Sequence, residues 1–503
     1  MTVVLVAEER KVDPARARFF QRVCSFPVML AVSLIVLAVL TVRSRFDDPD
    51  MWWHLKSGEI IWTTHAIPTT DIFSYTTGHH AYVPHEWLSQ VLIYGAYRTG
   101  GYTGLMLWLC FFTSALLIAG YGLCWVYSGN AKVGFLGAMV IWLFATIGLA
   151  IRPQMIGYLL LVFELLLIHL GRTRNPRWFL GLPLLFAVWV NCHGSFLLGL
   201  ILAGIFLFSS FFDFRIGALV SSSCEPHCRR MLALALVLSN AALFLNPIGV
   251  KQILYPLNTM LHQPIGLSLV QEWRPLQFDG ARGVAWFVIL GCVFLLCIMR
   301  KAELLWHELL LLALGAWLAC SHERMLFGFG ILVAPILSRL LSTEWGGFSP
   351  KEDLPWAYAV LIGAALIFAF WMFPTRQDLA GQVLKQSPVK AVAFIKSHHL
   401  SGRMFNEYVY GGYLIWAAPE HPVFIDGRAD IFEWSGVFEE YGQWVSLQSD
   451  PHTLLDKYGI DFCLLDRQSS MANVLPLLHD WKLAYSDNSS VIFTRTELRN
   501  TLN

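Results

Sequence analysis

The sequence predicts an α-helical protein that crosses a membrane many times and ends in a separate α/β domain. Of the 503 residues, 56% are hydrophobic and only 14% are charged, whereas about a quarter of a soluble protein is charged. The hydrophobic residues come in runs of about 20, the length that crosses the hydrocarbon core as a helix. After residue 373 these runs stop, and short strands alternate with amphipathic helices.

About eleven hydrophobic runs, bounded by charged residues, Pro and Gly, are the predicted membrane helices. They are 25–42, 103–127, 133–150, 155–170, 178–190, 196–212, 231–245, 284–299, 304–320, 325–341 and 355–373. The first run is followed by bulky, charged sequence without a small-residue cleavage site, so it predicts a membrane helix rather than a signal peptide.

Lys and Arg set the predicted orientation, because cytoplasmic loops carry an excess of them. With the amino end inside, roughly sixteen basic residues fall on the inner side and about nine on the outer loops. An odd number of spans then carries the C-terminal region outside. The predicted location is the cytoplasmic membrane, with the amino end inside and the tail outside.

The predicted domains are a cytoplasmic segment at 1–24, a membrane domain at 25–373 with a large first outer loop at 43–101, and an extracytoplasmic α/β domain at 374–503. The last contains a predicted helix at Val389–His398 and strands at Val423–Ile425, Phe462–Leu465, Lys482–Tyr485 and Val491–Thr494. Gly411-Gly412 and Asp426-Gly427 predict turns. The formal net charge of +1 gives no reason to expect nucleic-acid binding.

The first outer loop holds the densest group of chemically useful residues. Asp47, Asp48 and Asp50 follow the first span directly, with His54 and Lys56 a few residues later. A carboxylate at this boundary can act as a general base toward a hydroxyl, or bind a divalent cation that bridges a diphosphate. The alternative is a solvated Asp-rich helix cap beside Trp anchors, and composition alone favours neither.

Later in the same loop, His85 and Glu86 are predicted to start a helix. The helix dipole favours a carboxylate there, which is an adequate structural explanation of Glu86 by itself.

Further polar clusters fall where helices should end on the outer side. Their candidate substrate-binding residues are Arg152, His193, Glu272, Arg274, His322, Glu323 and Arg324. Ionisable groups near membrane depth are costly, so they are functional candidates by default. Each guanidinium could bind a phosphate bidentately, although an internal ion pair, such as Glu323 with an Arg, is the structural alternative. Together the clusters predict a cavity at the outer leaflet that holds an anionic lipid head group.

In the tail, Asp426, Arg428 and Asp430 follow a predicted buried strand, where functional groups often lie in α/β domains. They could contact an acceptor. A structural turn held by an Asp–Arg pair explains them at least as well.

These motifs resemble those of one group of bacterial integral membrane proteins over nearly the whole chain. The resemblance rests on Asp48-Pro49-Asp50, Trp53-His54-Leu55, Asp71 with Phe73-Ser74, His85-Glu86-Trp87-Leu88, Asn191 with His193-Gly194, Asn246-Pro247 with Gly249, Glu272-Trp273 and Phe424-Ile425-Asp426-Gly427-Arg428. The group is described as glycosyltransferase-like, of the GT-C type.

The resemblance implies a many-helix membrane enzyme with a catalytic carboxylate in its first outer loop and a soluble C-terminal domain. It implies a polyprenyl-phosphate-linked sugar donor and a glycan, lipid or protein acceptor. Asp48 or Asp50 matches the catalytic carboxylate, as base or as ligand of Mg²⁺ or Mn²⁺. Asp47 adds a third carboxylate to the family's simpler pattern, which leaves the identity of the base open. A Trp-Trp-Asp acceptor motif is missing from the tail, which argues against an amide acceptor.

Two other classes of protein stay open. A transporter or flippase for lipid-linked glycans would need inverted repeats or interrupted helices, and the sequence has no internal repeat. A non-catalytic protein of polysaccharide assembly would use the tail to bind glycan, and its loop-one carboxylates would be dispensable.

Overall fold

A computed structural model describes residues 14–78, 80–262, 271–300, 302–342, 346–349 and 353–496. Parts of the predicted cytoplasmic segment, of the outer loop at 246–283 and of the tail's end therefore lie outside the described residues.

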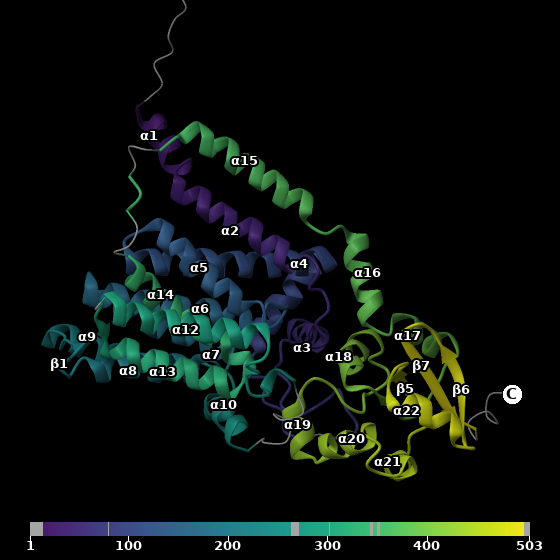
Figure 1. Cartoon of the computed structure of the whole chain (residues 1–503). Helices are drawn as coiled ribbons and strands as arrows, with labels where there is room; N and C mark the ends of the chain where they lie inside the picture. The colour runs from purple at the N-terminus through teal and green to yellow at the C-terminus, as the bar shows by residue number, and fades with distance from the viewer. Residues whose placement is uncertain are drawn as a thin grey trace, which may run out of the picture.

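Each predicted span coincides with a helix. These helices are α2 (Phe26–Val42), α4 (Trp87–Ser128), α5 (Ala131–Ala145), α6 (Gln154–Thr173), α7 (Gly181–Cys192), α8 (Phe196–Ser209), α9 (Pro226–Ala242), α12 (Ala281–Arg300), α13 (Trp306–Ser321), α14 (Leu326–Leu341) and α15 (Pro355–Met372). They run side by side with their ends at two faces of a helical body (Figure 1).

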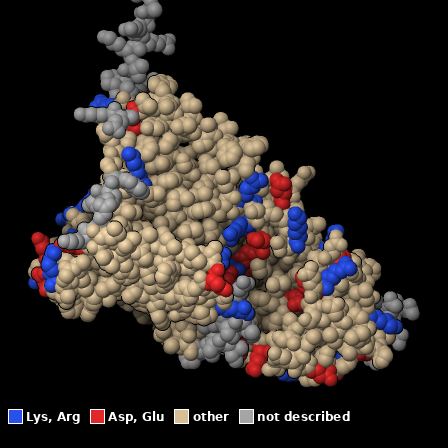
Figure 2. Space-filling view, in the orientation of Figure 1, with Lys and Arg blue, Asp and Glu red and all other residues tan. Residues whose placement is uncertain are grey.

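The helical body is a membrane protein by length and composition. Within the described ranges, five helices are long and apolar enough to cross a bilayer, namely α4, α6, α12, α14 and α15. Four shorter apolar helices accompany them, namely α2, α5, α8 and α13. Charged side chains are sparse over the visible face of this body and gather at its junction with the tail (Figure 2), as expected of a surface that faces lipid.

The body is packed around α14, which is buried along nearly its whole length. By contrast, α15 packs along α2 and buries only Ala369. At Gly101 (φ 58°) α4 turns sharply, in a conformation that glycine adopts without steric cost. Its segment before this kink belongs to the first outer loop, which is why hydrophobic patterning places the span only after Gly101.

Short elements join the helices at both ends. Near the junction with the tail are α3 (Asp50–Thr64), α10 (Val250–His262), η2 (Gln271–Trp273) and η3 (Glu323–Met325). Elsewhere are α1 (Pro14–Val23), η1 (Pro176–Leu180) and a small sheet of β1 (Phe214–Ile216), β2 (Leu219–Ser221) and β3 (Leu304–Leu305). In this sheet β2 pairs antiparallel with β1 and parallel with β3.

The C-terminal region is an α/β unit with a four-stranded sheet in the order β4-β5-β7-β6. Its strands are β4 (Met404–Asn406), β5 (Phe462–Asp466), β6 (Trp481–Ser486) and β7 (Ser490–Arg495). Its helices are α16 (Arg376–Gln386), α17 (Val389–Ser397), α18 (Tyr408–Ala417), α19 (Ala429–Trp434), α20 (Val437–Val445), α21 (Pro451–Lys457), α22 (Ser470–Val474) and η5 (Leu475–Leu477). The pair β4–β5 is parallel, and the other two pairs are antiparallel.

Two local predictions for the tail are wrong. Val423–Ile425 is not a strand of this sheet; Val423 makes an isolated parallel bridge to Ser74 of the first outer loop. Gly411-Gly412 is not a turn and lies inside α18. A side chain at Gly412 would place its Cβ 2.2 Å from the carbonyl oxygen of Pro49. Glycine is needed there because α18 packs directly on the start of α3.

The first outer loop therefore packs into the tail. Val423 donates its N–H to the carbonyl of Phe73, and Thr76 donates its hydroxyl to the carbonyl of Phe424. The rings of Trp52 and Tyr413 meet edge to face. These contacts fix the loop and the tail together above one end of the helical body.

Candidate functional site

The start of α3 brings the loop-one carboxylates against Arg152. Asp48, two residues before α3 begins, accepts the backbone N–H of Asp50 at 2.9 Å. Arg152, in the turn before α6, donates to both oxygens of Asp48 at 2.5 and 2.8 Å. It also lies 3.2 Å from Asp50 and 3.4 Å from Glu272 of η2. The predicted meeting of acidic and guanidinium groups from distant segments is therefore present.

Three carboxylates share this one guanidinium, so the cluster is short of positive charge. Burial raises the pKa of Asp50 to about 6, with Arg152 opposing the rise and Asp48 and Glu272 adding to it. The cluster thus favours an added proton or a further cationic group.

A divalent cation does not fit beside Arg152 in this arrangement. Both oxygens of Asp48 already accept hydrogen bonds from the guanidinium, and Asp50 lies on its other side. Among the residues that the structure describes, no group of three or more His, Cys, Asp or Glu is placed to hold a metal ion. Mg²⁺ or Mn²⁺ at Asp48 and Asp50 would require Arg152 to move away.

A cavity of about 510 Å³ opens beside this cluster, between the helical body and the tail. Its polar end is lined by His85, Glu86, His193, Arg324, Asp430 and Glu433. Its apolar wall is made largely by Leu197, Leu198, Ile201, Leu314, Trp317 and Leu318 of α8 and α13. The cavity is thus amphipathic, with ionisable side chains at one end and an apolar wall along its side.

Arg324 lies at the polar end of the cavity, near enough to Glu86 for its charge to oppose the rise in the pKa of that carboxyl. It donates one hydrogen bond to Gln154 at 3.1 Å, and its guanidinium lies 4.4 Å from the ring centroid of Trp273. A guanidinium has five N–H donors, so most of them can serve an anion.

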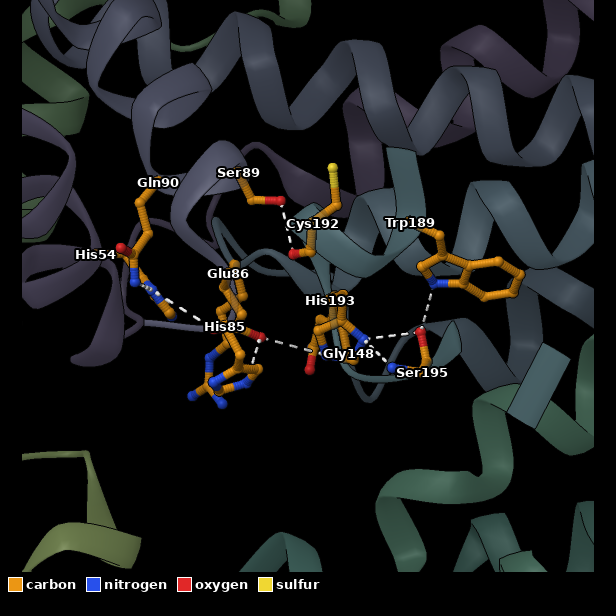
Figure 3. A network of polar contacts seen from close by, with 12 residues as sticks. His54, His85, Glu86, Ser89, Gln90, Gly148, Trp189, Cys192, His193 and Ser195 are labelled. Carbon is orange, nitrogen blue, oxygen red and sulfur yellow. Dashed lines mark hydrogen bonds and ion pairs between the residues drawn. The ribbon is translucent and has the colours of Figure 1, made fainter. Parts of the chain in front are cut away.

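Glu86 lies among three imidazoles at the same end (Figure 3). Its Oε1 is 3.7 Å from Nε2 of His85 and 3.5 Å from Nε2 of His193, and its Oε2 is 3.9 Å from Nδ1 of His54. Burial lowers the pKa of His85 to about 4 and that of His193 to about 3, and lowers that of His54 well below its usual range. The three imidazoles are therefore neutral at pH 7.

The fold of the whole chain resembles that of proteins of known structure. No protein-family model matches the sequence, and no curated protein sequence matches it. The structure resembles the Archaeoglobus fulgidus oligosaccharyltransferase tethered to an acceptor peptide, with 13% identity, a TM-score of 0.54, and coverage of 93% of this chain and 74% of that one. It resembles the same archaeal enzyme, AglB, in complex with an inhibitory peptide and a dolichol-phosphate, with 12% identity, a TM-score of 0.51 and coverage of 93% and 74%.

The chain has a GT-C-type fold. A structure of ArnT from Cupriavidus metallidurans bound to undecaprenyl phosphate also matches, with 12% identity over 96% of this chain and 98% of that one. Its TM-score of 0.48 does not by itself establish a shared fold.

Several predicted site residues line the cavity or touch its edge. His85, Glu86, His193, Arg324 and Asp430 form its wall. Asp50 and Arg152 lie directly behind the cavity wall. Gly427 is part of that wall, and it touches Asp50 so closely that a side chain at Gly427 would collide with the Asp50 carboxylate.

The structure places the remaining candidates elsewhere. Asp47 and Arg274 are exposed, and Lys56 pairs with Glu59 along α3 at 2.6 Å. Glu323 pairs with Arg282 at 2.8 Å, and His322 contacts the carbonyl of Trp273 at 2.8 Å. An internal ion pair, the structural alternative, thus accounts for Glu323.

Asp426 and Arg428 form a structural pair. Arg428 donates to Asp426 at 2.6 and 2.8 Å and to Asp71 of the first outer loop at 2.7 Å. Asp430, two residues later, instead reaches the cavity and accepts the hydroxyl of Tyr255. In the tail motif, Asp426 and Arg428 therefore hold the tail to the first outer loop, and Asp430 lines the cavity.

Sequence reasoning missed Tyr158, Tyr255 and Glu433 in the cavity wall. Tyr158 lies one helical turn after Gln154, a position that the helix period could have marked. Tyr255 lies in α10 and stacks on His85 with ring centroids 4.1 Å apart. Nothing in the sequence indicates that contact.

Proposed function

We propose that this GT-C chain transfers a sugar from a polyprenyl-phosphate-linked donor to a glycan, lipid or protein acceptor at the outer face of the cytoplasmic membrane. The observation that carries the proposal is the amphipathic cavity. Arg324 at its polar end suits a phosphate, and the flank made by α8 and α13 suits a polyprenyl chain. A site of this kind suits a phospholipid-like donor better than a free nucleotide sugar.

The fold comparison agrees with this ligand class. The archaeal enzyme of similar fold was solved with a dolichol-phosphate. That ligand belongs to that protein, and here it supports the choice of a polyprenyl phosphate as the first ligand to test.

In this mechanism the acceptor hydroxyl attacks the anomeric carbon and the lipid phosphate leaves. Arg324 stabilises the charge that develops on the phosphate. A carboxylate of the first outer loop takes the hydroxyl proton, and the sequence favours Asp48 or Asp50 for this role. Since Asp48 is engaged by Arg152 through both oxygens, Asp50 is the freer of the two.

The cavity and the tail lie at the end of the helical body that we assign to the outer side. The small sheet and α9, to which Arg215 and Arg229 belong, lie at the opposite end (Figure 1). Arg172 lies there too, because its guanidinium is 2.9 Å from the imidazole of His307, two residues after β3 of that sheet. This separation of charge supports an inner location for that end.

The first test measures binding of undecaprenyl phosphate to the purified full-length chain in nanodiscs. Arg324→Ala removes charge-assisted hydrogen bonds worth about 1.5–3 kcal/mol, so the lipid's Kd should rise at least about tenfold. Arg282→Ala is the matched control, because Arg282 pairs with Glu323 and does not line the cavity. Its Kd should match that of the unaltered protein.

Transfer is tested in the same nanodiscs with radiolabelled polyprenyl-phosphate sugars and a panel of hydroxyl and amide acceptors. Label appearing in an acceptor supports the enzyme. Binding without transfer to any acceptor would favour the non-catalytic assembly protein. Movement of intact lipid-linked sugar across a vesicle membrane would favour a flippase.

A further inference from the structure

Glu86 differs from the other first-loop carboxylates in what surrounds it. It lines the cavity, whereas Asp48 and Asp50 do not. The imidazole nitrogens nearest to its carboxyl are 3.5–3.9 Å away, beyond the usual hydrogen-bond range of about 2.7–3.2 Å. Its carboxyl oxygens can therefore accept a hydrogen bond from a ligand in the cavity.

One imidazole is fixed in the orientation that suits Glu86. The Nδ1 atom of His193 accepts the backbone N–H of Ser195 at 3.1 Å, so the proton of the neutral ring is on Nε2. Nε2 faces Glu86. The Ser195 hydroxyl is held in turn by the indole N–H of Trp189 at 3.0 Å (Figure 3).

Asp48 binds Arg152 rather than facing the cavity. Both of its oxygens accept hydrogen bonds from the guanidinium of Arg152, which holds this carboxylate in a bidentate pair. Asp48 thus positions Arg152 beside the cavity, and it is badly placed to receive a proton from a substrate inside it.

We propose that Glu86 is the general base that accepts the proton of the acceptor hydroxyl, and that His193 orients its carboxyl. This inference rests on the proposed function and names the carboxylate within it. The acceptor oxygen bonds to the anomeric carbon as the bond from that carbon to the phosphate oxygen breaks. The electron pair leaves on the polyprenyl phosphate, beside Arg324, and the proton passes to Glu86.

The titration of Glu86 agrees with this role. Burial raises the pKa of Glu86 to about 8, while Arg324 and Arg152 oppose the rise and Asp50 and Asp430 add to it. The titratable and charged groups that face it are His54, His85, His193, Tyr82, Tyr255, Cys192, Asp50, Asp430, Arg152 and Arg324. A base is most effective when its pKa lies near the working pH. The transfer rate should therefore rise with pH and level off above about 8.

The test compares Glu86→Gln, Asp48→Asn and the control Glu59→Gln in the nanodisc transfer assay. Glu59 is a first-loop carboxylate that pairs with Lys56, outside the cavity. Glu86→Gln should lower kcat about 100- to 10,000-fold and leave the Kd for undecaprenyl phosphate within about twofold. Formate should restore part of the rate to Glu86→Ala. Asp48→Asn should lower the rate but keep the rise toward pH 8, and Glu59→Gln should behave as the unaltered chain.

His193 is tested by the pH profile. His193 faces Glu86 with its Nε2–H group at 3.5 Å, and the positive end of that N–H dipole favours the ionised carboxyl. His193→Ala removes this dipole, so the rise in transfer rate should move to higher pH. His193→Gln, whose amide N–H can face Glu86 in the same way, should hold the rise near pH 8. If the unaltered chain transfers sugar, either of two results overturns this inference alone. One is a full transfer rate in Glu86→Gln, and the other is an unchanged pH profile in His193→Ala. An unaltered chain that binds lipid phosphate and transfers nothing overturns the proposed function and this inference together.

Discussion

Three arginines near the junction of body and tail differ in their partners. Arg428 is buried and meets two carboxylates, Asp71 and Asp426, so its charge is compensated within the fold. Arg152 is outnumbered by the carboxylates around it. Arg324 hydrogen-bonds to the neutral Gln154 and faces the cavity. The local balance of charge separates Arg324, which suits an anionic ligand, from Arg152 and Arg428, whose charges are compensated by carboxylates of the fold.

Arg428→Ala should destabilise the tail severely. It leaves Asp71 and Asp426 buried without their cation, a loss of about 3–5 kcal/mol for a broken buried pair. Amide hydrogen exchange in β5 should become markedly faster, as measured by mass spectrometry on the full-length protein. The control is Lys396→Ala, because Lys396 and Glu420 are both about half exposed and such pairs contribute about 1 kcal/mol or less. Equal exchange in the two variants would contradict the structural role of Arg428.

At the scale of single elements, the contact between α18 and α3 depends on Gly412. The backbone carbonyl of Pro49 occupies the space of a Cβ, and backbone cannot move aside as a flexible side chain can. Gly412→Ala should therefore cost about 1–3 kcal/mol, as overpacking does. Gly381→Ala on α16, where a Cβ meets nothing within 4 Å, should instead stabilise by about 0.5–1 kcal/mol.

Thermal unfolding in detergent checks the Gly412 prediction through the sign of each shift. The midpoint should fall for Gly412→Ala and hold or rise for Gly381→Ala. A rise in both variants would show that α18 does not pack on α3 as described.

Elements were more predictable from sequence than their contacts. The hydrophobic runs predicted each long helix, because length and apolarity alone decide whether a segment suits a bilayer. The pairing of Arg428 with Asp71 joins residues 357 positions apart, and no periodicity connects them. The sequence predicted a cavity because several polar clusters fall where helices should end on one side of the membrane. Which carboxylate lines the cavity depends on how the first loop folds, so the sequence favoured Asp48 or Asp50 as the base rather than Glu86.

At the scale of the whole molecule, the fold places charge at two ends of an apolar body. One end carries the tail, and the other carries the small sheet, which includes Arg215, together with α9 (Figure 1). The cavity lies at the end with the tail, since residues of the tail form part of its wall. Since the positive-inside rule orients membrane proteins by such loops, the small sheet should face the cytoplasm. The tail should then face outward.

Labelling of intact spheroplasts with a membrane-impermeant maleimide tests this orientation. Ser435→Cys, at an exposed position before α20, should react from outside, and Gly217→Cys, at the exposed turn between β1 and β2, should react only after lysis. The unaltered chain measures the background from its own cysteines, each of which is buried or half-buried. If Gly217→Cys reacts in intact spheroplasts while Ser435→Cys does not, the chain is inverted. The cavity would then open toward the cytoplasm, where a donor in the outer leaflet could not reach Arg324.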